Sequence, residues 1–283
     1  MLKVFGFVSR NQRLTHDEYR AGHVGYHNSF GRRLNNIRGY LLNVRANRAL
    51  DDVVGGSLMN ELTVSEPEAF DSQWDGWGQL LFDSLDDYLA ARSPARDRAG
   101  PDGLQVDANV AGVGGDFEHL YSGSPFQFHV REHLCAPVRR PERKLFKLAQ
   151  FAKRHENLPP ELFIAYWTGR YASLVAQAPG LRGMIVNVRT DVDVMDGFFA
   201  PDSECYAPAG IRRRETFYSG WDGIAEYWFD RPEDFARLRT EVKLGAELAR
   251  LEQRIFQRCF YREVDETVAV MPNRRPAPTF YHR

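Results

Sequence analysis

The sequence contains an internal repeat that aligns without a gap over 42 residues. Residues 3–44 match residues 147–188 at a constant shift of 144 positions, and residues 74–92 match residues 221–239 at a shift of 147. Chance rarely places so many identities at one shift, so the chain carries two copies of one unit that must fold alike. The identities of the first match include Lys3/Lys147, Phe7/Phe151, Arg10/Arg154, Ala21/Ala165, Arg38/Arg182 and Asn43/Asn187.

Each copy follows a strand–helix–strand–strand–helix–strand pattern. Apolar residues alternate between the two sides of residues 2–8, which predicts a strand covered on both faces. Thr15 followed by Glu18 has the form of a capping box and predicts the start of the first helix. Pro160 fits the first turn of its counterpart in the second copy. Residues 223–229 are predicted to form the third strand of that copy.

The order βαββαβ is that of the ferredoxin-like split unit. Two such units in one chain predict an α+β protein whose repeats pack as a pseudo-dimer, burying sheet surface that one repeat would expose. We assign residues 1–136 to the first repeat and residues 144–270 to the second. Residues 137–143 are then the linker and residues 271–283 a C-terminal tail.

Two further patterns concern the second copy. A short third match sets Glu132 of the first copy against Glu263. Three consecutive arginines, residues 212–214, fall between its second and third strands. Such a run can attract a carboxylate or a phosphate, but we predict a solvated charged loop here.

The composition excludes several classes of protein. Hydrophobic residues make up 43% of the chain and aromatic residues 13%, which is enough for a substantial core. The formal net charge of −1 provides no basic field, so we expect no nucleic-acid partner. Cys135, Cys205 and Cys259 are odd in number and far apart, which argues against disulfides and cysteine-rich zinc sites. No signal peptide and no apolar run of about 18 residues are evident, so we expect a cytoplasmic protein without a membrane partner.

Two histidines four residues apart, His23 and His27, lie in the first predicted helix. One helical turn separates them, so we expect both imidazoles on one face. Val24 occupies the position of the glutamate in an HExxH zinc motif, and a third ligand would have to come from His129 or His133. The spacing permits a metal, but we predict no metal site.

The second copy contains "LPPELFIAYWTGRYASLVAQAPGLRGMIVN", in which Trp167 follows Phe163 by four residues and precedes "APGLRG". This stretch resembles the EthD family of the dimeric α+β barrel superfamily. In the family pattern a histidine follows the tryptophan by four residues. Tyr171 stands there in the second copy, whereas the first copy keeps that histidine as His27 and has His23 in place of the tryptophan. The resemblance implies that the two ferredoxin-like βαββαβ repeats close into an intramolecular dimeric α+β barrel.

The resemblance also implies a range of reactions. Relatives in the superfamily are implied to include cofactor-free monooxygenases, lactone isomerases, polyketide cyclases, dehydratases and some haem enzymes, with a small ligand between sheet and helices. Fold alone therefore leaves the reaction open. We predict a cofactor-independent enzyme that transfers a proton on a hydrophobic, aromatic or polyketide-like small molecule, as a lyase, dehydratase, cyclase or isomerase. The alternatives are a cofactor-free monooxygenase, a haem-dependent dehydratase and a non-catalytic ligand-binding protein.

Imidazole exchanges protons near neutral pH, which makes His27, assisted by His23, the predicted proton carrier. Tyr171 is the candidate acid of the second copy, and the alternative for all three is a packed core side chain. A homodimer is left open as the assembly. The predicted substrate-binding residues are Tyr19, Tyr26, Trp74, Trp77, His129, Arg131 and Trp167.

Overall fold

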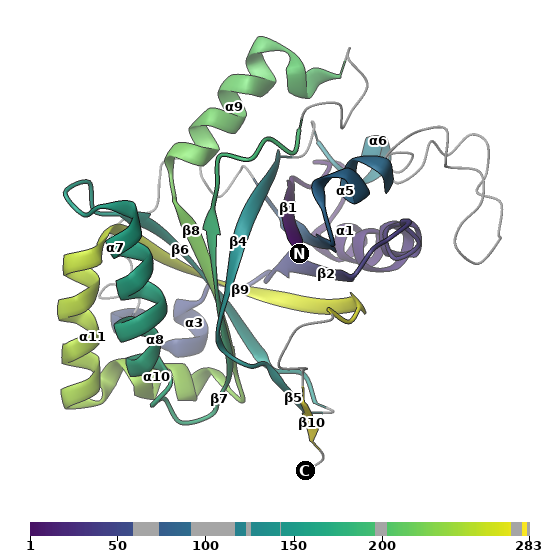
Figure 1. The fold of residues 1–283 in the computed structure, drawn as a ribbon. Helices are drawn as coiled ribbons and strands as arrows, with labels where there is room; N and C mark the ends of the chain where they lie inside the picture. The colour runs from purple at the N-terminus through teal and green to yellow at the C-terminus, as the bar shows by residue number, and fades with distance from the viewer. Residues whose placement is uncertain are drawn as a thin grey trace.

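The computed structural model describes residues 1–58, 74–91, 117–122, 126–141, 143–195, 203–272 and 279–281. Eight antiparallel strands close into a barrel in the order β1-β3-β2-β9-β6-β8-β7-β4 (Figure 1). The strands are β1 (Leu2–Val8), β2 (Gly39–Arg45), β3 (Gly76–Phe82), β4 (Phe126–Ala136), β6 (Phe146–Arg154), β7 (Leu181–Arg189), β8 (Gly223–Phe229) and β9 (Phe256–Val270).

The two halves of the chain contribute four strands each, in the same order. The first half runs β4-β1-β3-β2 and the second runs β9-β6-β8-β7. The barrel closes because the last strand of each half pairs with the second strand of the other, β4 with β7 and β9 with β2. The predicted α+β class and the packing of two βαββαβ halves as an intramolecular barrel are confirmed.

The register of the last strands corrects one sequence match. Glu132 of β4 lies opposite Asn187 of β7, and Glu266 of β9 lies opposite Asn43 of β2. Since Asn43 and Asn187 are repeat equivalents, Glu132 corresponds to Glu266, and its match with Glu263 is wrong. The compared stretches are only about seven residues long, which is too short for a few identities to fix the register between the copies.

A helical segment with a π-helical middle follows the first strand of each half. The predicted capping box is confirmed, because the Glu18 amide donates to Thr15 Oγ1 at 3.2 Å and the Thr15 amide donates to Glu18 Oε2 at 2.7 Å. Pro160 lies in the first turn of the second segment, as predicted. The segments are α1 (His16–Ala21), π-helical Gly22–His27 and α2 (Asn28–Gly31), and α7 (Pro160–Ala165), π-helical Tyr166–Tyr171 and α8 (Ala172–Val175).

The prediction of a loop at residues 212–214 is wrong, because these arginines belong to α9 (Pro208–Ser219). This helix covers one end of the barrel, and its buried residue is Phe217 (Figure 1). With so small a buried face, the helix shows no amphipathic period in sequence. The remaining elements are α3 (Asp51–Val54), α5 (Leu85–Ala91), α6 (Phe117–Leu120), Glu204–Tyr206, α10 (Pro232–Thr240), α11 (Val242–Ile255) and the parallel pair β5 (Arg139–Pro141) and β10 (Thr279–Tyr281).

Side chains fill the barrel interior in two chemically different layers. The layer toward α9 is aromatic, and in it Phe151 stacks on Phe260 with ring centroids 5.0 Å apart. The layer toward β5 is ionic and surrounds the buried amines of Lys3 and Lys147. Residues 273–278 and 282–283 of the predicted tail lie outside the described residues. None of the helices in the described ranges combines the length and apolar character needed to cross a bilayer.

Candidate functional site

Three aromatic rings of the first helical segment form a stacked column. The ring centroids of Tyr19 and His23 are 5.3 Å apart with an interplanar angle of 17°, and those of His23 and His27 are 5.4 Å apart with an angle of 10°. All three side chains are buried, with 0%, 1% and 8% exposure in chain order. The predicted placement of both imidazoles on one helix face is therefore confirmed.

Tyr121 closes the side of this column. It follows α6 and forms an isolated bridge with Arg10 next to β1. Its ring lies edge-on to Tyr19, His23 and His27, with centroid distances of 6.2, 5.8 and 5.6 Å. Its hydroxyl is 2.6 Å from His23 Nδ1. The sequence analysis missed Tyr121, because it lies 98 positions from His23 in a stretch outside the repeat matches.

Two polar atoms of the column are buried and have no hydrogen-bond partner among the described residues. They are His23 Nε2 and the Tyr19 hydroxyl. Burial, and then the neighbouring His27, holds the pKa of His23 well below its usual range, so the imidazole is neutral near pH 7. Burial, and then the negative charge of Asp75, raises the pKa of Tyr19, so its hydroxyl stays protonated. A buried polar atom without a partner is costly, and a bound ligand can satisfy it.

The bond between His23 and Tyr121 permits two protonation patterns, because a phenol hydroxyl can donate or accept. When His23 Nδ1 donates to Tyr121, the unpartnered Nε2 carries a lone pair and can accept a proton. When Tyr121 donates to Nδ1, Nε2 carries the proton instead. The pair can therefore take a proton at one nitrogen and release one at the other.

The equivalent rings of the second half are packed, and the hydroxyl of Tyr171 is hydrogen-bonded. Phe163 lies 5.0 Å from Trp167 between ring centroids, and both are buried. The Tyr171 hydroxyl lies 3.1 Å from Gln150 Nε2, 3.1 Å from the Tyr261 hydroxyl and 2.9 Å from Glu252 Oε1. The buried indole nitrogen of Trp167 has no partner among the described residues, but an indole N–H can only donate, whereas His23 Nε2 can also accept a proton.

An ion pair anchors this second network. Arg239 contacts both carboxylate oxygens of Glu252 at 2.6 and 2.7 Å. Burial, and then the charge of Glu252, raises the pKa of Tyr171 well above its usual range. Tyr171 is accordingly a neutral hydroxyl in a network that is already satisfied.

The other predicted site residues do not gather at the column. Trp74 and Trp77 lie 5.5 Å apart in the aromatic layer inside the barrel. His129 is half-buried on β4, with Nδ1 2.6 Å from Thr190 Oγ1. Tyr26 and Arg131 are exposed, Tyr26 by 51%.

No group of three His, Cys, Asp or Glu side chains in the described part of the chain is arranged to hold a metal ion. A haem iron takes a single axial histidine, and His23 Nε2 is a nitrogen without a partner among the described residues, while Nδ1 bonds Tyr121. In the described part of the column, His23 therefore offers one imidazole nitrogen rather than the ligand set that a zinc ion needs.

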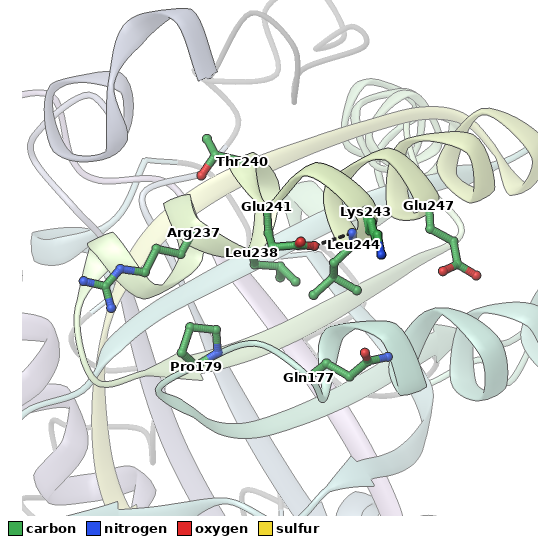
Figure 2. A pocket seen from close by; sticks show the side chains of 9 residues that line it. All are labelled: Gln177, Pro179, Arg237, Leu238, Thr240, Glu241, Lys243, Leu244 and Glu247. Atoms are coloured by element: carbon green, nitrogen blue, oxygen red, sulfur yellow. Dashed lines mark hydrogen bonds between the residues drawn. The ribbon is translucent and has the colours of Figure 1, made fainter.

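A groove of about 650 Å³ lies in the second half, away from the column (Figure 2). Its charges balance, since Arg237 and Lys243 are matched by Glu241 and Glu247. Glu241 is already used, because its carboxylate accepts from the Leu244 amide at the start of α11. The lining residues are Gln177, Pro179, Arg237, Leu238, Thr240, Glu241, Lys243, Leu244 and Glu247.

Comparisons with known proteins place the chain by fold. A protein of Fusobacterium nucleatum subsp. nucleatum, described as a candidate monooxygenase, is similar with a TM-score of 0.53 and 8% identity, over 94% of this chain and 92% of that chain. A protein of Lactobacillus acidophilus with the same description gives 0.49 and 7% identity, over 95% of each chain. An anthrone oxidase-like protein gives 0.47 and 9% identity, over 95% of this chain and 93% of that chain.

At 8% identity, the similarity to the Fusobacterium nucleatum protein shows a shared fold. A search of curated protein sequences finds no match. Residues 155–250, which include Trp167 and Tyr171, match the family model of the EthD domain. The chain therefore folds as a closed α+β barrel whose second half matches the EthD domain model over residues 155–250.

Proposed function

We propose that this protein is an enzyme that removes a proton from a hydrophobic, aromatic or polyketide-like small molecule. The observation that carries the proposal is the buried neutral His23, with Nδ1 on the Tyr121 hydroxyl and Nε2 without a partner among the described residues. In this proposal Nε2 accepts the substrate proton, and the imidazolium so formed keeps its Nδ1–H bonded to the Tyr121 hydroxyl until the proton is returned to the product or to water. The substrate carries an acidic C–H or a phenol, because an imidazole can ionise these when they are held beside it.

The neighbours of His23 suit a substrate with an apolar body and one oxygen. His27 is the least buried ring of the column, and we assign it to orienting the substrate against His23. The Tyr19 hydroxyl is protonated and unpartnered among the described residues, so it can donate to an oxygen on which negative charge develops. No cofactor is needed for this step, and an absorption spectrum without a Soret band is the expected result for the purified protein.

Proton removal can be tested apart from the later chemistry. Probes with an acidic C–H, such as 1,3-diketones and activated aromatic methylenes, exchange that hydrogen in deuterium oxide, and NMR follows the exchange. We expect His23→Ala to slow catalysed exchange by about 100-fold or more, the usual contribution of a general base. His119→Ala is the matched control, because His119 is an exposed histidine of the neighbouring α6. An unchanged rate in His23→Ala rules out His23 as the base.

Oxygenation is the second candidate reaction, favoured by the shared fold with a protein described as a candidate monooxygenase. A deprotonated methylene can react with molecular oxygen to give a carbonyl and water. The step balances without an added reductant, because one oxygen atom becomes the carbonyl oxygen and the other leaves as water with the two methylene hydrogens. A lyase or isomerase would instead return the proton elsewhere and consume no oxygen. An oxygen electrode separates the two, because only oxygenation depletes dissolved oxygen in step with product.

A further inference from the structure

A second cavity of about 200 Å³ lies at the end of the barrel where β6 begins, next to β5. Figure 1 shows β5 at the end of the barrel away from α9. Four basic side chains, one carboxylate and several apolar side chains line the cavity. None of them belongs to the histidine column, so this site is separate from the proposed function.

The floor of the cavity is a satisfied ionic cluster. Lys147 is 1% exposed and donates to Asn43 Oδ1, Glu226 Oε1 and Glu266 Oε2, each at 2.6 Å. Glu266 also accepts from Arg140 Nη1 at 2.5 Å. The amine of Lys147 has therefore used its three donors, and Glu266 is neutralised by two cations.

Positive charge is left over around this cluster. Arg140 Nη2 is buried and has no hydrogen-bond partner among the described residues, and the whole side chain is only 15% exposed. Arg143 pairs with Asp230 at 2.8 Å, and Asp230 also pairs with Arg182. One carboxylate serves two guanidinium groups there, Lys144 pairs with Asp265, and the described lining of the cavity itself holds four basic side chains and one carboxylate. A buried unpaired guanidinium nitrogen beside excess positive charge calls for an anion.

We propose that this cavity binds a small organic carboxylate with a compact apolar body. The carboxylate accepts from Arg140 Nη2, and the apolar body packs on Trp228, Val268 and Met271. The Trp228 ring is buried and lines the cavity, with the Lys147 amine 4.5 Å and the Arg140 guanidinium 5.8 Å from its centroid. A volume of about 200 Å³ is below the usual range of roughly 300–1,000 Å³ for drug-sized ligands, so a body the size of benzoate or hexanoate fits best.

Isothermal titration calorimetry of the full chain tests the proposal with benzoate, hexanoate and inorganic phosphate as probes. We expect one saturable benzoate site per chain, weakened at least tenfold by Arg140→Lys, which keeps the charge but lacks Nη2. Val268→Phe should abolish binding by filling the cavity while every charge remains. Arg139→Met is the matched control, because Arg139 is the exposed neighbour on the same strand, and it should bind as the wild type does.

Several results would overturn the assignment. One is the absence of saturable carboxylate binding up to millimolar concentration, and another is unchanged binding in either folded variant, Arg140→Lys or Val268→Phe. If phosphate binds as tightly as benzoate, charge alone explains the binding, and the proposed contact with an apolar ligand body is wrong. Loss of benzoate binding in His23→Ala would place the ligand at the histidine column instead. Circular dichroism and thermal unfolding confirm that each variant is folded, and either cavity variant alone decides the outcome.

Discussion

The first strand of each half is followed by a helical segment of the same geometry, but the two segments carry opposite side-chain chemistry. The first presents Tyr19, His23 and His27, and the second presents Phe163, Trp167 and Tyr171. In both, the segment packs on a glycine at the start of a strand. A Cβ added to Gly76 would lie 2.6 Å from the Tyr19 hydroxyl, and one added to Gly223 would lie 2.7 Å from the Trp167 ring. The backbone arrangement is shared, so the side chains alone separate the two sites.

The sheet beneath each segment shows the same contrast. Gln150 of β6 donates to Tyr261 at 2.9 Å and to Tyr171 at 3.1 Å, and thereby fills the space under the second segment. Its repeat equivalent is Gly6, which has no side chain, and Gln127 lies 3.7 Å from where a Cβ would be. In the described residues the second half bonds its tyrosine hydroxyl and leaves the Trp167 indole nitrogen, which can only donate, without a partner, whereas the first half leaves the Tyr19 hydroxyl and an imidazole nitrogen without partners. This difference is the reason for assigning the chemistry to the first half.

Inside the barrel the two halves remain nearly symmetric. Lys3 contacts Glu132 at 2.6 Å and Asn187 at 2.8 Å, and Lys147 contacts Glu266 and Asn43 at 2.6 Å each. The symmetry breaks at one pair, because Gln79 stands where the second half has Glu226. Gln79 donates to Glu226 at 2.5 Å, and Glu226 also contacts both lysines, at 3.4 Å for Lys3 and 2.6 Å for Lys147. One carboxylate at this pair thus serves both halves.

The largest expected difference between the halves is catalytic. His23→Ala should lower the rate of proton transfer by about 100-fold or more. Trp167→Ala at the equivalent position should instead lower the free energy of unfolding by roughly 3–5 kcal/mol, the cost of a large buried cavity. Rate measurements and urea unfolding on both variants check this. The assignment to the first half fails if Trp167→Ala removes activity in protein that is fully folded.

We expect the Gln79–Glu226 pair inside the barrel to tolerate an exchange of its two residue types, but not two glutamates or two glutamines. Glu226→Gln leaves two buried lysines short of a carboxylate and should cost roughly 3–5 kcal/mol of stability. Gln79→Glu crowds two carboxylates together and should also destabilise the fold. The double variant Gln79→Glu/Glu226→Gln keeps one carboxylate between the lysines, so it should recover most of the loss. Urea unfolding of all three measures the coupling, and simple additivity of the single effects would contradict a shared carboxylate.

Acid should unfold the ionic layer before the aromatic one. Desolvation alone would raise the pKa of Glu266, but Lys147 and Arg140 outweigh it and lower the pKa to about 2. Because the folded pKa is below the unfolded value, this stabilisation is present above about pH 4.5 and is lost as the pH falls toward 2. Protonation of Glu266 should therefore lower the free energy of unfolding by roughly 3 kcal/mol. Glu266→Gln should flatten the dependence of the unfolding free energy on pH in this window, and an unchanged slope argues against the buried pair.

The column should give a smaller dependence on pH near neutrality. Burial and His27 lower the pKa of His23, so below about pH 6.5 the unfolded chain binds a proton that the folded chain does not. The free energy of unfolding should therefore fall as the pH drops below 6.5, and His23→Phe should reduce this fall. If the base is His23, kcat/KM should also stay level below pH 6.5, because the imidazole remains neutral. A rate that declines with an ordinary histidine pKa would point to another base.

The smallest effect is expected at Tyr171. Tyr171→Phe removes one hydroxyl from a buried network, which should cost about 1–2 kcal/mol of stability. Activity should change less than twofold if the first half alone carries the chemistry. A large loss of activity in folded Tyr171→Phe would restore the second half as a candidate site.

Local sequence signals located the elements that depend on neighbouring residues. The capping box of Thr15 and Glu18, the proline start at Pro160 and strand 223–229 are all as predicted. They were predictable because each depends on residues within one turn or one strand. The sequence did not predict helix α9, because a helix that buries few residues has no periodic pattern of apolar residues to detect.

The repeat by itself determined that two like units pack together. Two copies of one βαββαβ unit have few ways to bury their sheets other than against each other, so the pairing of the halves followed from the alignment, whereas closure into a barrel was implied by the resemblance to the EthD family. Tertiary structure alone brought Tyr121 to His23 and the buried carboxylate of Glu226 to both lysines. Those contacts join segments 79 to 223 residues apart, and no local spacing encodes them. The repeat thus determined where the two columns lie, and long-range packing decided which polar atoms of each column are bonded.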